Sequence, residues 1–184
     1  MTHQNQDPIT VTNYLRATKP TLILPCSAQK LDTREQAFNL YQGKGYMGIV
    51  RQWPREVIEG VFNVLFLSAK YGLIPANERI APYEQALTPE RIKEFASAKS
   101  LRNKAQGWLR MMNQNAPVYV MLPSLYQAGL EALAGATLPR FSHVERAAGG
   151  IGSQRGQLRQ AIVKEVAAQK ERSLLIASSF TNSG

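Results

Sequence analysis

The chain has 184 residues, 44% of them hydrophobic, a size that favours one well-buried domain; its 22 Lys and Arg against 13 Asp and Glu give a net charge of +9, which favours a polyanionic partner. A single cysteine excludes an internal disulfide, and with only two histidines the composition argues against metal sites built from several Cys or His side chains. The amino terminus lacks a signal-peptide pattern and no apolar run approaches a membrane span, so we expect a cytoplasmic protein without a membrane partner.

The first part of the chain alternates apolar, β-prone runs with helical spacing. Residues 1–19 are polar and weakly patterned, which indicates an arm before a first strand at 20–25. Helical spacing follows at 33–41 and 47–59, and Pro54 must begin or bend a helix there. A second strand is predicted at 63–67.

The rest of the chain continues the alternation. Thr88 is placed to cap a helix and Pro89 suits its first position, so a long helix is predicted to run on over 91–115. The remaining predictions are strands at 117–122 and 138–144, helices at 124–133 and 154–170, and a tail at 173–184.

Alternation of this kind predicts an α/β protein: a three-layer α/β/α sandwich, with a mostly parallel sheet of about four strands, in a single domain over residues 20–172. Right-handed crossovers then place the loops after Pro25, Leu67, Leu122 and Val144 at one edge of the sheet. Ligands bind at such edges in open α/β sheets, so a binding or catalytic site is expected there.

The loop after the first strand offers a thiol, a hydroxyl, an amide and an ammonium, from Cys26, Ser27, Gln29 and Lys30. Backbone N–H groups at a following helix start would meet an anion that Lys30 neutralises. The alternative is an ordinary strand-end turn with a buried cysteine and a solvated lysine. Cys26 is disfavoured as a nucleophile because no histidine lies nearby in sequence to act as its base.

The loop after the second strand repeats the pattern with an aromatic residue. Tyr71 is suited to stack on a base, Lys70 to bind phosphate, and Ser68 to read a polar edge; the alternative is a tight turn whose tyrosine packs on the core. Further on, Tyr83 supplies a second aromatic ring and Glu84 a carboxylate, with Asp32 and Glu78 as less favoured acids.

A glycine-rich stretch, GGIGSQRG at 149–156, runs into the last predicted helix. Such a loop brings backbone N–H groups close to phosphate and the helix start adds its dipole, although a flexible connector is equally consistent. The stretch fits neither a Walker loop nor a dinucleotide fingerprint. The predicted phosphate contacts there are Gly150, Gly152, Ser153, Arg155 and Arg159.

The ordered segments CSAQK, AFNLYQG, LFLSAKYGLI, IAPYEQAL and GGIGSQRGQL, within about residues 22–158, support a resemblance. The set resembles a bacterial and phage family related to the YaaA-like peroxide-stress proteins. It is also similar to the catalytic segment of archaeosine synthase, whose proline-cysteine-serine-lysine strand end is matched by Pro25, Cys26, Ser27 and Lys30. The group resembles the uracil-DNA-glycosylase superfamily in architecture and includes antiphage glycosylases that remove glucosylated hydroxymethylcytosine from viral DNA.

The resemblance implies a base-acting nucleic-acid enzyme, most specifically a DNA glycosylase for a modified base. The uracil-glycosylase motifs Gly-Gln-Asp-Pro-Tyr-His and His-Pro-Ser-Pro are absent, so the catalytic residues must come from this chain's own loops. We expect Glu84, Lys30 and Ser68 to be catalytic, and no metal or organic cofactor. The expected base contacts are Cys26, Ser27, Gln29, Tyr71 and Tyr83.

The expected partner is DNA, including modified phage DNA, with RNA left open and the oligomeric state undetermined. One alternative is a base transferase acting on 7-deazaguanine in tRNA or DNA, in line with the archaeosine resemblance. Another is a non-enzymatic DNA-binding stress protein of the YaaA type, and a third is a protein that binds a small nucleotide.

Overall fold

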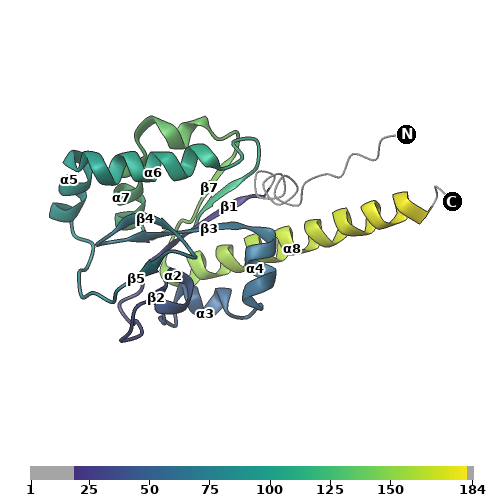
Figure 1. Ribbon diagram of the computed structural model, residues 1–184, viewed down its shortest axis with the longest axis horizontal. Helices are drawn as coiled ribbons and strands as arrows, with labels where there is room; N and C mark the ends of the chain where they lie inside the picture. The colour runs from purple at the N-terminus through teal and green to yellow at the C-terminus, as the bar shows by residue number, and fades with distance from the viewer. Residues whose placement is uncertain (1–18, 182–184) are drawn as a thin grey trace, which may run out of the picture.

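A twisted, mostly parallel sheet forms the centre of the molecule (Figure 1). The computed structural model describes residues 19–181, with side chains described as far as Leu174, so the predicted arm lies almost wholly outside the described residues. The five strands are ordered β4-β3-β1-β6-β7. Their bounds are β1 Thr21–Pro25, β3 Asn63–Ser68, β4 Gly72–Pro75, β6 Val118–Val120 and β7 Val144–Arg146.

The sheet pairs mostly in parallel because its strands are linked by helical crossovers. β1 pairs in parallel with β3 and β6, and β6 pairs in parallel with β7. β4 is antiparallel to β3, since it follows that strand through a tight turn at which Gly72 has φ +72°. All five residues of β1 are buried, as its uninterrupted apolar run predicts for a central parallel strand.

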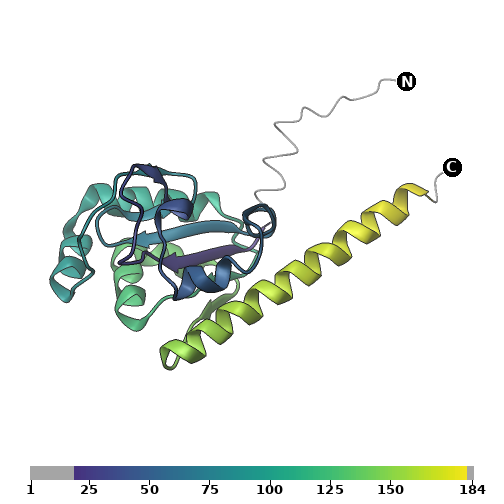
Figure 2. The same ribbon diagram turned by 90° about the horizontal axis from the view of Figure 1, so that it is seen from below.

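Helices cover both faces of the sheet (Figures 1 and 2). One face carries α5 (Pro89–Ser97), α6 (Lys99–Met111) and α7 (Ser124–Ala134). The other carries α3 (Tyr46–Val50), α4 (Arg55–Val61) and α8 (Ile151–Thr181). The short helix α2 (Ala37–Leu40) packs Phe38 against Phe66 of β3, with the ring centroids 6.4 Å apart, and contacts a two-stranded ribbon of β2 (Glu35–Gln36) and β5 (Arg79–Ile80).

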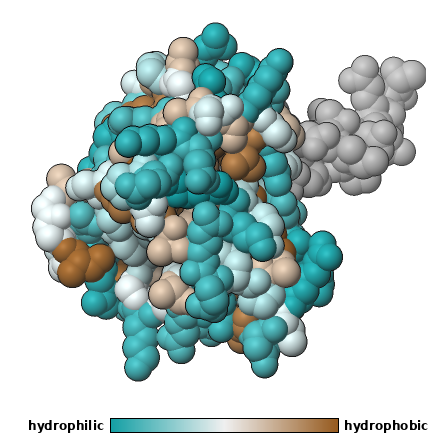
Figure 3. Space-filling view, turned by 90° about the vertical axis from the view of Figure 1, so that its left-hand side faces the viewer, coloured by the Kyte–Doolittle hydropathy of each residue, from teal (hydrophilic) through white to brown (hydrophobic). Residues whose placement is uncertain are grey.

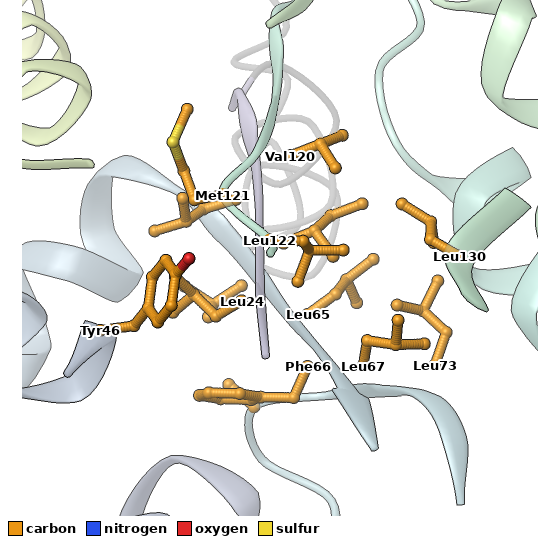
Figure 4. Packing of buried hydrophobic residues seen from close by; sticks show 14 of the residues in the cluster. Leu24, Tyr46, Leu65, Phe66, Leu67, Leu73, Val120, Met121, Leu122 and Leu130 are labelled. Atoms are coloured by element: carbon orange, nitrogen blue, oxygen red, sulfur yellow. The ribbon is translucent and has the colours of Figure 1, made fainter. Parts of the chain in front are cut away.

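Apolar side chains pack on both faces of the sheet (Figure 4). Leu65 and Leu67 of β3 lie with Leu130 of α7 on one side, whereas Phe66 points to the other side, as the two-residue period of a strand requires. Burial of these large side chains anchors the strand ends that carry the polar residues discussed below.

Several predicted boundaries are confirmed. Thr88 caps α5 by accepting a hydrogen bond from the N–H of Arg91, and Pro89 is the first helical residue. The helix predicted over 47–59 is split before Pro54, which precedes α4. The single long helix predicted over 91–115 is wrong, because Ala98 leaves helical geometry at ψ 85° and separates α5 from α6.

The last part of the chain differs most from the expectation. Residues 135–140 form a 3₁₀ helix and the final strand is β7, so the strand predicted at 138–144 is displaced towards the C-terminus. α8 begins at Ile151 and continues to Thr181, so the described part of the predicted tail is helical. The C-terminal, yellow part of this helix projects past the domain, as Figure 2 shows.

None of the helices described between Lys19 and Thr181 is both long enough and apolar enough to cross a membrane.

Candidate functional site

The carboxyl ends of the parallel strands meet at one edge of the sheet, as predicted. Pro25, Ser68 and Arg146 end β1, β3 and β7, and the chain leaves β6 at the same edge. Figure 3 views the molecule from this end, where the surface is mostly hydrophilic with small apolar patches. The candidate site is built on these strand ends.

Ser68 is the centre of the site and is fully buried. Its Oγ accepts hydrogen bonds from the backbone N–H groups of Lys70 at 3.2 Å and Tyr71 at 3.0 Å. The same oxygen donates its proton to the hydroxyl of Tyr83 at 2.7 Å. Because Ser68 is the last residue of β3, the tight turn into β4 folds back over its side chain.

Tyr83 links this serine to a second buried phenol. The hydroxyls of Tyr83 and Tyr41 lie 2.9 Å apart, and we call Ser68, Tyr83 and Tyr41 the hydroxyl cluster. The Tyr71 ring meets the Tyr83 ring edge to face, with their centroids 5.4 Å apart. The ammonium of Lys30 lies 4.3 Å from the centroid of the Tyr83 ring, a cation–π contact.

Cys26 lies beside the hydroxyl cluster and contacts another phenol. Its Sγ is 3.3 Å from the hydroxyl of Tyr126, which comes from α7. Burial, and next the nearby Cys26 sulfur, raise the pKa values of Tyr83, Tyr41 and Tyr126. These phenols therefore remain protonated at neutral pH, so each has one proton to donate.

Other predicted site residues lie outside the hydroxyl cluster. Ser27 donates to the carbonyl of Gln29 at 2.5 Å and accepts from the N–H of Gly43, so it holds its own loop together. The Gln29 side chain is exposed, and the Lys70 ammonium lies 5.3 Å from the centroid of the Tyr71 ring. The Ser27 and Gln29 side chains therefore make no hydrogen bond with the tyrosines of the hydroxyl cluster, and the Lys70 ammonium lies outside its buried centre.

The three predicted acids differ in their surroundings. Glu84 directly follows Tyr83 in the chain and is exposed, and it has no ion pair or side-chain hydrogen bond with any residue described in the structure. Glu78 pairs with Lys104 at 2.7 Å, which engages that acid away from the hydroxyl cluster. Asp32 is likewise exposed and has no hydrogen bond or ion pair with a described residue, but of the three predicted acids only Glu84 directly follows a member of the hydroxyl cluster in the chain.

The glycine-rich stretch is mostly helix, and its prediction as a loop is wrong. Gly149 has φ +82° and turns the chain, and α8 starts at Ile151, so Gly152, Ser153 and Gly156 lie within the helix. The turn is held by Gln154, which is buried, donates to the carbonyl of Gly149 at 2.7 Å and accepts from the Tyr46 hydroxyl. Burial raises the pKa of Tyr46 to about 12.

The start of α8 lies some way from the hydroxyl cluster. Gly150, Gly152 and Ser153 are exposed there, as are Arg155 and Arg159 on the following turns. β7, which leads into α8, is three positions from β3 in the sheet. At about 4.8 Å between neighbouring strands, the two strand ends are roughly 14 Å apart.

Sequence reasoning missed three side chains that build the site. Tyr41 stands within the AFNLYQG segment but carried no assigned role. Tyr126 lies 100 residues from its partner Cys26, and no local signal marks it. Arg91 binds the backbone carbonyls of Ala69 and Lys70, each at 2.8 Å.

The described residues 19–181 contain no group of three His, Cys, Asp or Glu side chains placed to hold a metal ion.

Comparison with known proteins identifies a family. Residues 21–160 match the sequence model of DUF6884, a family of unknown function. Comparisons with curated proteins and with solved structures returned no match. The matched region starts at β1, ends within α8 and contains the hydroxyl cluster, Lys30, Cys26 and Glu84. The chain therefore belongs to the DUF6884 family.

Proposed function

We propose that this protein is a base-acting nucleic-acid enzyme with an architecture like that of uracil-DNA glycosylases, and most specifically a DNA glycosylase for a modified base. One observation carries the proposal. At the carboxyl edge of the sheet, a buried hydroxyl, two aromatic rings and an ammonium meet around Tyr83, and the next residue, Glu84, is an exposed carboxylate that no described residue engages.

The chemistry of these groups suits a flipped nucleotide. A base inside a duplex must leave the stack before its glycosidic bond is accessible, at a cost of a few kcal/mol. Tyr71, which is partly exposed, offers a ring for stacking, and the protonated phenols offer donors to acceptor atoms of the base.

Hydrolysis then needs one water and one carboxylate. As the bond between the sugar C1′ and the base nitrogen breaks, the Glu84 carboxylate stabilises the positive sugar and takes a proton from the attacking water. The water oxygen bonds to C1′, the departing base nitrogen takes up a proton from solvent, and Glu84 returns the proton it took from water to solvent. Lys30 stabilises the negative charge that develops on the base before it is protonated.

The charge distribution supports a nucleic-acid partner. The chain carries a net charge of +9, and Arg155 and Arg159 are exposed on the first turns of α8. Phosphates that flank the flipped nucleotide would contact these arginines and Lys70, so binding should weaken steeply as salt is raised.

Base release tests the proposal directly. We would incubate the protein with DNA containing uracil, hydroxymethylcytosine or glucosylated hydroxymethylcytosine, and measure free base by chromatography and abasic sites by alkaline cleavage. Glu84→Gln should lower the release rate by about 100-fold or more, while Glu171→Gln, at an exposed glutamate far along α8, should leave it unchanged.

The outcomes separate the proposal from its alternatives. Absence of release from every modified DNA would refute the glycosylase. A non-enzymatic DNA-binding protein would instead bind DNA in a salt-sensitive way without releasing base. Its binding would persist in three variants: Ser68→Ala, Tyr71→Ala and Glu84→Ala. Base exchange in tRNA would indicate a transferase.

A further inference from the structure

Two peptide groups of the β3–β4 turn are held from both sides. On one side, Arg91 Nε donates to the carbonyl of Ala69 and Arg91 Nη2 donates to the carbonyl of Lys70, each at 2.8 Å. On the other side, the N–H groups of Lys70 and Tyr71 donate to Ser68 Oγ.

These four hydrogen bonds belong to the same two peptide units. The carbonyl of Ala69 and the N–H of Lys70 share one planar group, and the carbonyl of Lys70 and the N–H of Tyr71 share the next. In a trans peptide the C=O and N–H bonds point in opposite directions. By binding the two carbonyls, Arg91 therefore aims both N–H groups at Ser68.

This arrangement determines which hydroxyl donates and which accepts in the hydrogen bonds of the hydroxyl cluster. A serine hydroxyl has one proton and two acceptor positions. Both acceptor positions of Ser68 are occupied by the turn, so its proton goes to Tyr83. Of the two phenolic protons on Tyr83 and Tyr41, one fills the contact between them, and the other is left for the Cys26 sulfur or for an acceptor on a bound ligand.

Arg91 is itself well placed for this task. Its backbone N–H is bound by the cap residue Thr88, and its guanidinium stacks over the Phe95 ring at 4.9 Å. Its side chain is 18% exposed, and its third nitrogen pairs with Glu94. A guanidinium presents donors in a rigid fork that reaches two carbonyls at once, which an ammonium cannot reproduce.

We infer that Arg91 is a positioning residue: by clamping the carbonyls of Ala69 and Lys70 it orients Ser68 and makes the hydroxyl cluster a proton donor towards the ligand. The effect on turnover rests on the proposed glycosylase activity, whereas the effect on the turn does not.

Hydrogen exchange tests the clamp without any assumption about function. In Arg91→Lys, the amide protons of Lys70 and Tyr71 should exchange about tenfold faster than in the wild type by NMR. Glu94→Gln, which removes the ion pair but not the clamp, and Arg110→Lys, at an exposed arginine on α6, should leave both rates unchanged. Unchanged rates in Arg91→Lys would overturn the inference.

A measurement on the wild type covers the case in which Arg91→Lys does not fold. The Nε proton of Arg91, which is donated to a carbonyl, should exchange at least about tenfold more slowly than that of Arg110. Equal rates would mean that the clamp does not form in solution.

Turnover then tests the link to Ser68. Arg91→Lys should lower kcat about 10-fold to 100-fold with KM changed by less than about threefold, because the clamp orients groups rather than binding substrate. In a Ser68→Ala background the same change should have no further effect on kcat. If the two effects multiply instead, Arg91 does not act through Ser68. If the wild type releases no base, the proposed function fails while the exchange result still decides the clamp.

Discussion

Removal of one hydroxyl should show how much the hydroxyl cluster contributes to stability. In Tyr83→Phe, the Ser68 proton loses its acceptor at 2.7 Å and the Tyr41 hydroxyl loses its partner at 2.9 Å. Ser68 and Tyr41 are each 0% exposed, so water does not replace the lost bonds. At about 1–2 kcal/mol for each buried group left without its partner, the free energy of unfolding should fall by about 2–4 kcal/mol.

Tyr71→Phe is the matched control for this substitution. The chemical change is the same and the two rings touch, but the Tyr71 hydroxyl makes a single exposed bond of 3.3 Å to the carbonyl of Ala81. Its loss should cost less than about 1 kcal/mol.

Urea unfolding followed by tryptophan fluorescence measures the free energy of unfolding of both variants. In thermal unfolding of a domain of this size, the predicted losses correspond to a Tm lowered by roughly 5–15 °C in Tyr83→Phe and by less than about 4 °C in Tyr71→Phe. In a double-mutant cycle, Tyr83→Phe and Ser68→Ala should be coupled by about 1 kcal/mol. Equal losses in the two phenylalanine variants would refute the reasoning.

Three further predictions concern the rest of the protein. Gly43→Ala should destabilise the fold by about 1–3 kcal/mol, since a Cβ there would lie 2.7 Å from Ser27 Cβ, whereas Gly45→Ala, with open space around it, should not; chemical denaturation compares them. Tyr119→Phe should cost about 1.5–3 kcal/mol because it removes the 2.6 Å bond to the buried Glu165 carboxylate; a loss no larger than that of Glu165→Gln would contradict this. Stability should fall as pH rises above 10, tyrosine's ordinary pKa, because burial raises the pKa of five tyrosines in the folded state and the unfolded state then binds fewer protons: Tyr41, Tyr46, Tyr83, Tyr119 and Tyr126. Phenolate absorbance from these side chains should appear together with the loss of helical circular dichroism. Its appearance well before unfolding would refute this prediction.

Much of the fold follows from local patterns. The apolar runs at β1 and β3 and the Thr88-Pro89 pair at the start of α5 depend on neighbouring residues, and the structure confirms them. The break at Ala98 does not follow in this way, because the helical spacing continues across it and the packing of α5 and α6 against α7 decides where the helix ends.

The candidate site likewise has one part that follows from local sequence and one part that does not. Local sequence is enough to predict that polar residues follow the strands and that a strand ends near Ser68, because strand periodicity is a property of neighbouring residues. The contacts between Tyr41 and Tyr83, 42 residues apart, and between Cys26 and Tyr126, 100 residues apart, arise from the tertiary fold. Such contacts depend on the order of strands in the sheet and on where each crossover helix packs, and both are set by burial of the whole core rather than by any single segment.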